Sequence, residues 1–423
     1  MSALWIALRL GWRNLWRNPR RSLITLAAIA AAYAFLIGMI GLMEGLKNQL
    51  LRNGTRLQLG DFQIHESNYL PDRNINDTIG ADEGVDLQAL LARISTQPEV
   101  EGLSARVYGF GLLSTGSFSS GAQLLGVDPA AELSVTTLLR GLRPGSSLPA
   151  GGARGLILGQ ALAEEIHARP GAEVAVVTQS ADGTLGNDLF HVVGILRTGL
   201  SYQDRSLAVT HRSDLQELLA LARGRVHEVA GRIRDPLRAD RVCALLNGSG
   251  LLPPHTKAQS WGELSPQLRD YVKLSESTNG LMIFLVALFA AFGVLNTTMM
   301  AVFERTREIG MLGSLGMRPA LILLTILLES LFLGLLGLAG GFGIGALMMS
   351  YLTTHGWDLS QWVGEVSMLG TRMDPILKGA WSWGQVGWAA GGLIAATLLA
   401  AFLPARRVAW MQPVAALAAP TEG

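Results

Sequence analysis

The sequence predicts a membrane protein with four transmembrane α-helices and one large α+β domain inserted between the first and second spans. Three observations support this architecture. The 423 residues are 49% hydrophobic and only 16% charged, with a mean hydropathy of +0.32, whereas a soluble domain is about 25% charged. Four apolar stretches reach the roughly 20 residues that a helix needs to cross a bilayer. The long stretch between the first two has an ordinary soluble composition.

The four spans are expected at residues 22–45, 277–303, 320–352 and 381–404. The first could be mistaken for a cleaved signal peptide, because it follows two arginines and contains the small-residue pattern Ala32-Tyr33-Ala34. Its apolar run continues through Met43, which is longer than the roughly 7–15 residues of a signal-peptide core. We therefore expect a retained anchor.

The first 21 residues predict an amphipathic helix that lies in the membrane interface. Its apolar residues fall at helical spacing: Trp5, Leu8, Trp12, Leu15 and Trp16. Arginines at positions 9, 13 and 17 follow another face, and tryptophan beside a basic stripe is typical of interfacial helices. The alternative is a helix packed on a soluble partner.

Basic residues beside the spans predict the orientation. The N-terminal segment, the loop at 304–319 and the tail at 405–423 together carry ten basic and three acidic residues, whereas the insert at 46–276 has 22 basic and 25 acidic ones. By the positive-inside rule both termini are cytoplasmic. The insert and the loop at 353–380 are then on the outer side.

Short β-rich runs alternate with helical patterns in the insert, which predicts an α+β domain with βαβ-like pieces. Strands are expected at 63–65, 103–113, 122–127, 173–178, 190–196 and 207–210. Helices are expected at 87–94, 159–166, 213–222 and 236–246.

Several kinds of chemistry are absent from the sequence. No lysine follows a glycine in the P-loop pattern, and the seven histidines form no zinc-hydrolase motif. The single cysteine, Cys243, permits no intrachain disulfide. Charges in the insert are interspersed, so nucleic-acid binding has no support. We expect no catalytic residues, no metal and no cofactor bound by this chain, and therefore not an enzyme.

The loop at 304–319 is charged at its start and apolar afterwards. A simple cytoplasmic loop has no need of Ile309, Met311, Leu312 and Leu315, which would be exposed to water. Exposed apolar residues bracketed by charges favour docking into a groove on a partner.

The same loop, E-R-T-R-E-I-G-M-L-G-S-L-G at 304–316, resembles the signature of the FtsX-like, macrolide-exporter (MacB) and lipoprotein-releasing permeases of ABC transporters. Residues 13–22 and 404–414 resemble the family's entry to the first span and exit from the fourth. Residues 124–129 and 192–196 are similar to its periplasmic domain. The resemblance covers essentially the whole chain.

The resemblance implies a permease of the inner membrane of a diderm bacterium, working as a dimer with an identical or related second copy. Two copies of a separate ATPase subunit would bind ATP and Mg²⁺, and helix motion would reach the periplasmic domains by mechanotransmission. The implied ATPase-coupling residues are Glu304, Arg305, Arg307, Glu308, Ile309, Gly310, Met311, Leu312, Leu315 and Gly316.

Within the family, Gln63-Ile64-His65 and the lack of a fused ATPase look more like the lipoprotein-releasing branch, so we expect a lipophilic substrate such as a lipoprotein. Membrane lipids and a periplasmic chaperone or adaptor are further expected partners. Candidate acyl-chain contacts, which could equally be ordinary span residues, are Phe35, Met39, Leu42, Met43, Met282, Phe289 and Phe292. The alternative function is a signalling subunit that activates a periplasmic cell-wall hydrolase without transport.

Two features of the third span remain. Gly337, Gly341 and Gly345 have the spacing that lets helix backbones approach closely, in either a sliding or a static contact. Glu329 is an intramembrane carboxylate, which is costly unless paired. It is expected either to pair with Arg305 or Arg318 or to act in conformational coupling.

Overall fold

The computed structural model describes residues 3–80, 85–142, 147–149, 151–360, 367–368, 371–372 and 376–411. The chain forms two compact units. One comprises Met1–Asn48, Lys273–Gln361 and Ile376–Gly423, and the other Gln49–Val272 and Trp362–Pro375. Parts of the predicted loop at 353–380 and of the tail at 405–423 lie outside the described residues.

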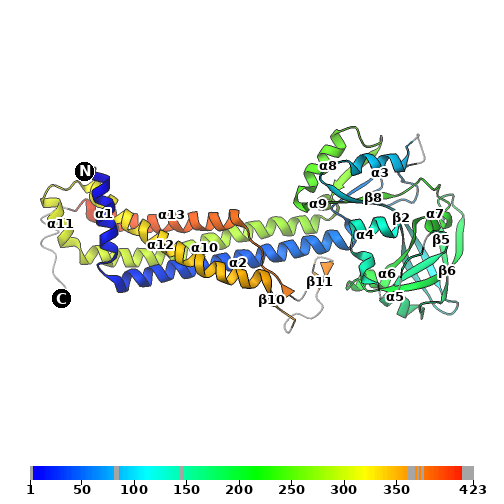
Figure 1. Ribbon diagram of the computed structural model, residues 1–423, viewed down its shortest axis with the longest axis horizontal. Helices are drawn as coiled ribbons and strands as arrows, with labels where there is room; N and C mark the ends of the chain where they lie inside the picture. Colours follow the sequence, from blue (N-terminus) through cyan, green and yellow to red (C-terminus); the bar gives the residue numbers. More distant parts are fainter. Residues whose placement is uncertain are drawn as a thin grey trace. The chain divides into compact units, whose positions relative to one another are not determined.

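The first unit is helical (Figure 1). It contains α1 (Ala3–Leu15), most of α2 (Pro19–Gly54) and of α10 (Pro266–Glu304), and α11 (Thr306–Ser314), α12 (Pro319–Thr354) and α13 (Trp383–Ala409). Within the described ranges, four helices are long and apolar enough to cross a membrane: α2, which a π-helical turn extends to Leu59, α10, α12 and α13. Three of these four begin with a proline. Proline suits the first helical turn because its missing N–H has no partner there anyway.

The centre of the bundle is the packing of α2 against α12 and α13. Ile29, Tyr33 and Ile37 of α2 are buried in one apolar cluster with Ala389 and Leu393 of α13. The Tyr33 hydroxyl donates a hydrogen bond of 3.2 Å to the carbonyl of Val386, which satisfies its polar atom inside the apolar bundle.

The three glycines singled out in the sequence lie on the face of α12 that touches α2. A Cβ atom at Gly337 would lie 2.7 Å from Ile29, and one at Gly345 would lie 2.8 Å from Ile37. At Gly341 it would lie 2.6 Å from the Ala30 carbonyl oxygen, which belongs to the backbone and cannot rotate away. These glycines therefore set how closely the two helices approach.

Replacing Gly341 by leucine should force α2 and α12 apart and destabilise the bundle by about 1–3 kcal/mol, the usual cost of overpacking. The matched control is Gly343→Leu, because a Cβ atom at Gly343 has nothing within 4 Å. Thermal unfolding in a neutral detergent measures both. Equal midpoints for the two variants would contradict this packing role.

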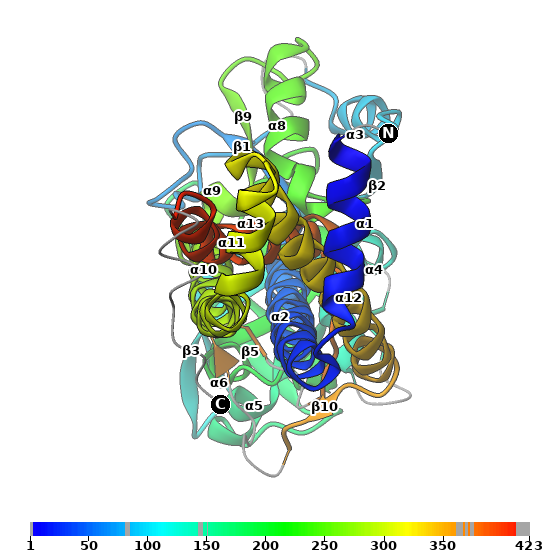
Figure 2. The ribbon, with the colours of Figure 1, turned by 90° about the vertical axis from the view of Figure 1, so that its left-hand side faces the viewer.

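Helix α1 packs on α12, and both views show the two helices beside each other (Figures 1 and 2). The Trp12 ring meets Phe332 edge-on at a centroid distance of 5.6 Å. Gly11 is buried and lies against Leu328 and the backbone at Glu329. Trp5 and Trp16 remain about half exposed, so one face of α1 is buried in the unit and another is available to a lipid or a partner.

The second unit is built on a nine-stranded mixed sheet, counted over the described residues. In sheet order the strands are β3 (Ser119–Val127), β7 (Leu207–His211), β4 (Gly155–Gly159), β6 (Leu185–Leu196), β5 (Glu173–Gln179), β2 (Val100–Ser114), β8 (Glu228–Ile233), β1 (Phe62–Glu66) and β9 (Thr256–Ser260). The pairs β3–β7 and β4–β6 are parallel and the others antiparallel.

Strand β3 also pairs with the long strand β2, so six strands from β3 to β2 form a closed ring of hydrogen-bonded neighbours. Closure removes the exposed edges that would invite pairing with another chain. An apolar cluster that includes Leu125, Ile157 and Val209 is fully buried against this ring. The three remaining strands continue from the first half of β2 and end at β9.

Helices complete this unit: α3 (Leu87–Ser95), α4 (Pro129–Val135), α5 (Gln160–Glu165), α6 (Ser201–Ser206), α7 (Arg212–Leu218), α8 (Ala239–Gly248) and α9 (Trp261–Leu264), with a π-helix, η1 (Thr55–Leu59), and 3₁₀ turns η2 (Leu138–Gly141) and η3 (Pro236–Arg238). The short pair β11 (Ser367–Met368) and β12 (Thr371–Arg372) belongs to this unit, and the pair β10 (Trp357–Asp358) and β13 (Ile376–Leu377) to the first.

Helix α8 is amphipathic and buries Val242, Cys243 and Leu246. It is fixed beside β9 by Asn247, whose side chain donates to the Ala258 carbonyl at 2.9 Å and accepts from the Ala258 N–H at 2.8 Å. The cysteine is thus a small apolar core residue.

All six predicted strands and all four predicted helices of the insert overlap observed elements. Strands β4, β8 and β9 and helices α4, α6 and α9 were not expected. The five residues of β4 are buried throughout, so they lack the alternation of a half-exposed strand. Strand β9 reads Thr-Lys-Ala-Gln-Ser, which is too polar to stand out as a strand.

Candidate partner-binding site and its supporting contacts

The predicted coupling segment forms a short helix between two long ones. Helix α10 ends at Glu304, Arg305 leaves helical geometry with φ −104° and ψ 10°, and α11 follows. Gly316 then adopts a φ of +89°, a conformation that favours glycine. Proline at 319 starts α12. The backbone is thus folded back between α10 and α12 by residues suited to turns.

Two acidic residues of this segment are paired within the chain. Glu308 accepts two hydrogen bonds from Arg17, one of them at 2.6 Å, and Glu304 pairs with Arg21 at 2.9 Å. The hydrogen bond from Arg17, and then its charge, lower the pKa of Glu308. These carboxylates thus tie α11 and the end of α10 to the N-terminal segment.

Glu329 pairs with Arg305 at 3.2 Å, and both side chains are largely buried. Arg305 also donates to the Asn14 carbonyl at 3.2 Å. One guanidinium therefore links α12, the α10–α11 junction and α1. Of the two cations that the sequence offers, Arg305 and not Arg318 forms the ion pair with Glu329 among the described residues.

The apolar part of α11 is only partly covered. Met311, Leu312 and Leu315 are 50%, 40% and 82% exposed, whereas Gly310 is buried and Ile309 is half-buried. Arg307 and Gly316 are exposed. The three exposed side chains form the free apolar surface of this segment.

The candidate acyl-chain contacts divide into two groups. Phe35, Phe289 and Phe292 are more than half exposed, and Met39, Leu42, Met43 and Met282 are half-buried. A groove of about 350 Å³ between α2 and α10 is lined by Phe289 but by none of the other six. The structure therefore does not gather these residues around one cavity.

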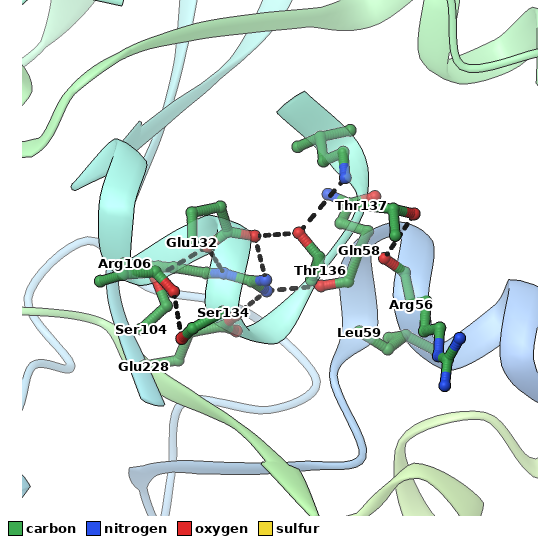
Figure 3. Close-up of polar contacts among 12 residues, drawn as sticks. Arg56, Gln58, Leu59, Ser104, Arg106, Glu132, Ser134, Thr136, Thr137 and Glu228 are labelled. Atoms are coloured by element: carbon green, nitrogen blue, oxygen red, sulfur yellow. Dashed lines mark hydrogen bonds and ion pairs between the residues drawn. The ribbon is translucent and has the colours of Figure 1, made fainter. Parts of the chain in front are cut away.

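A cluster that sequence reasoning missed lies in the second unit (Figure 3). Arg106 on β2 is fully buried and holds Glu132 of α4 through two hydrogen bonds, at 2.6 and 2.9 Å. It also pairs with Glu228 of β8 at 3.0 Å. Ser104 and Thr136 donate to Glu132 at 2.7 and 2.6 Å, so every oxygen of this carboxylate is bonded.

This cluster also holds the π-helical turn η1, which follows α2 directly. Arg106 donates to the Gln58 carbonyl at 2.5 Å, and the Thr137 N–H donates to the Arg56 carbonyl at 2.7 Å (Figure 3). Carbonyls at a helix end have no partner inside the helix. Donors from strand β2 and from the residues that follow α4 therefore fix η1, the extension of α2, in this unit. The available signal was a lone arginine in an otherwise apolar predicted strand.

Replacing Glu132 by glutamine should remove about 1–3 kcal/mol of stability, because Arg106 loses charge-assisted hydrogen bonds and the new amide N–H group lies beside its donors. Glu228 still balances the Arg106 charge in this variant. Burial alone would raise the pKa of Glu132, but the charge and hydrogen bonds of Arg106 outweigh it and lower that pKa. The contribution of ionised Glu132 to the free energy of unfolding is therefore complete above the pKa of a glutamate in the unfolded chain, about 4.3. It is lost as the pH falls through the lower pKa of Glu132 in the folded protein. The stability of Glu132→Gln should not show this loss.

Denaturant unfolding of the full chain between pH 3 and 7 tests both statements, with Glu173→Gln as the control because Glu173 is largely exposed. Equal stability of Glu132→Gln and wild type at pH 7 would show that the cluster is not needed to stabilise this unit.

Among the described residues, no group of three or more His, Cys, Asp or Glu side chains is placed to hold a metal ion. The clusters around Glu308, Glu329 and Arg106 are ion pairs and hydrogen-bond networks inside the chain.

Comparison with known protein families matches both units. Residues 280–413 match the family described as FtsX-like permease C-terminal. Residues 22–247, more than half of the chain, match the MacB-like periplasmic core domain. The chain belongs to this family of permeases. The four apolar helices fit a membrane protein, and the second unit contains most of the family's periplasmic core.

Two relatives and one solved structure illustrate the similarity. The chain is 27% identical to the lipoprotein-releasing system transmembrane protein LolC of Neisseria meningitidis, over 98% of each chain. It is 25% identical to the pyoverdine export ATP-binding/permease protein PvdT of Pseudomonas aeruginosa, over 97% of this chain and 58% of that protein. The crystal structure of the periplasmic region of MacB from Actinobacillus actinomycetemcomitans matches half of this chain and 94% of its own, with 14% identity and a TM-score of 0.34.

Proposed function

We propose that this ABC transporter permease couples ATP hydrolysis in a separate ATPase subunit to a movement of its periplasmic domain that releases a lipoprotein from the inner membrane. The observation that carries the proposal is full-length similarity to a lipoprotein-releasing protein, together with an apolar surface on α11 that the chain itself leaves open. The excess of basic residues beside the spans supports cytoplasmic termini and a periplasmic second unit.

The ATPase is proposed to bind α11. Glu308 of α11 is already engaged with Arg17, and Glu304 at the end of α10 with Arg21, so a partner would gain little from these two carboxylates. Met311, Leu312 and Leu315 instead offer apolar area, which drives association when it leaves water.

Leu315→Asp should abolish ATPase binding, with at least a tenfold loss of co-purified subunit, because a carboxylate in an apolar groove is costly to desolvate. Leu315 is 82% exposed, so the unfolding temperature of the isolated chain should not change. Leu315→Met is the control and should bind normally. If the aspartate variant retains its ATPase, α11 is not the docking helix.

The substrate is proposed to be a lipoprotein in the outer leaflet, held between two permease copies. The three exposed phenylalanines on α2 and α10 provide apolar contacts for acyl chains. Motion of the spans would reach the periplasmic unit through α2, whose end is fixed by the Arg106 cluster. A periplasmic acceptor, such as a chaperone, would then take the released lipoprotein.

A purified complex of this chain with its ATPase should carry a bound lipoprotein, detectable by mass spectrometry, and should release it on addition of ATP and Mg²⁺. An ATPase variant that binds but does not hydrolyse ATP is the control and should retain it. A complex that turns over ATP but carries no lipoprotein, and instead activates a cell-wall hydrolase, would contradict release and favour the signalling alternative.

A further inference from the structure

Two cavities in the helical unit are adjacent. The first, of about 350 Å³, lies among α1, α2, α10, α11 and α12, at the end of the helical unit that faces the viewer in Figure 2. The second is the groove between α2 and α10, also about 350 Å³. Thr25 of α2 and Thr297 of α10 line both, so the two cavities share part of their walls.

The first cavity is basic. Four arginines line it, Arg13, Arg17, Arg21 and Arg305, against two carboxylates, Glu308 and Glu329. Both carboxylates are already engaged, one by Arg17 and the other by Arg305. Arg13 has no ion pair with any described residue, and its guanidinium remains available to an anion.

Three of the hydroxyl groups around this cavity are already used: Thr25, Thr325 and Ser330 donate their hydrogen bonds to carbonyls of their own helices at 2.8–3.2 Å. Arg17, Arg21 and Arg305 pair with Glu308, Glu304 and Glu329. Arg13 is therefore the arginine of the cavity whose charge an anion could balance. Guanidinium groups suit phosphate because they offer several N–H donors in one plane.

The second cavity is apolar along its whole length. Ile24, Ala28 and Ala32 line one wall and Val286, Phe289 and Gly293 the other, and no charged residue contributes. From Thr25 to Ala32 the groove follows about 10 Å of α2, at ~1.5 Å per residue. Small side chains on both helices leave room for a slender hydrocarbon chain.

We propose that the two cavities together bind one anionic glycerophospholipid of the leaflet that the arginine-rich end faces. Its phosphate would lie in the basic cavity beside Arg13, and an acyl chain would follow the groove between α2 and α10. A soluble phosphate compound would leave the groove empty, and a neutral lipid would leave the arginines without an anion. Basic pockets between transmembrane helices are known to bind anionic head groups.

This inference goes beyond the proposed function and requires only that the bundle lies in a membrane. Residues of α11 and of the turn after it also line the basic cavity, among them the proposed docking residues Met311, Leu312 and Leu315. A bound head group would therefore contact α1 and α11 at once and restrict their relative movement. The site would make partner binding sensitive to the charge of the surrounding lipid.

The test uses the full chain, without ATPase, in a neutral detergent, with lipid binding followed by native mass spectrometry. Phosphatidylglycerol should bind at least fivefold more tightly than phosphatidylcholine of the same acyl chains, since one basic residue near a membrane surface contributes about this factor. Arg13→Gln should remove that preference, and Ala28→Trp should block the groove and weaken both lipids.

Each variant has a matched control, in which the same substitution is made at a residue outside the two cavities. Arg20 and Ala27 are exposed and line neither cavity, so Arg20→Gln and Ala27→Trp should bind phosphatidylglycerol like wild type. The proposal is overturned if Arg20→Gln weakens binding as much as Arg13→Gln, which would indicate a general surface charge effect. It is also overturned if glycerol 1-phosphate displaces the lipid with equal affinity, or if Ala28→Trp only dissociates a dimer and leaves lipid binding unchanged. Since no ATPase is present, these results are independent of the docking test on α11.

Discussion

The ion pair between Arg305 and Glu329 is the contact on which the arginine-rich end of the bundle depends. A carboxylate on an apolar helix is stable only with a partner, and the pairing places the α10–α11 junction directly against α12. The same guanidinium holds α1 through the Asn14 carbonyl. The direction of α11, and with it the position of the exposed apolar side chains, follows from where this one guanidinium lies.

The second unit also contains a buried arginine that pairs with carboxylates and donates to a backbone carbonyl, here beside η1, which follows α2. A single arginine, Arg106, forms ion pairs with two carboxylates and also donates to a carbonyl of the π-helical turn. Buried ion pairs of this kind add little net stability compared with apolar packing, but they tolerate only one arrangement of their partners. Both networks therefore fix geometry at points where long helices end.

Apolar length and charge distribution were enough to predict the helical bundle and the insert. The glycine spacing also predicted a close helix contact, though not that α2 is the neighbour. The closed ring of strands could not be predicted, because it depends on pairing between residues that are distant in the sequence. Strand β4 was missed because it is fully buried and shows no alternation of apolar and polar residues. The ion pairs of Arg106 with Glu132 and Glu228 could not be predicted either, because these residues are also distant in the sequence.

The role of the charged residues of the 304–316 segment in ATPase coupling stays a prediction. A sequence shows that Glu304 and Glu308 precede an apolar run, but not that Arg17 and Arg21 lie beside them. The sequence alone also could not show which of the candidate acyl-chain contacts lie in a groove. Apolar residues in a span look alike whether they line a groove, pack on a neighbour or face lipid, and only the helix arrangement separates these cases.

The burial of Cys243 has a practical consequence for following the motion of this permease. Burial, helped by the nearby charges of Glu263 and Asp240, raises the pKa of its thiol to about 12. The reactive thiolate is therefore nearly absent at neutral pH. Cysteines introduced at two exposed positions would then be the thiols that react readily. A pair of spectroscopic labels can therefore be attached without first replacing Cys243.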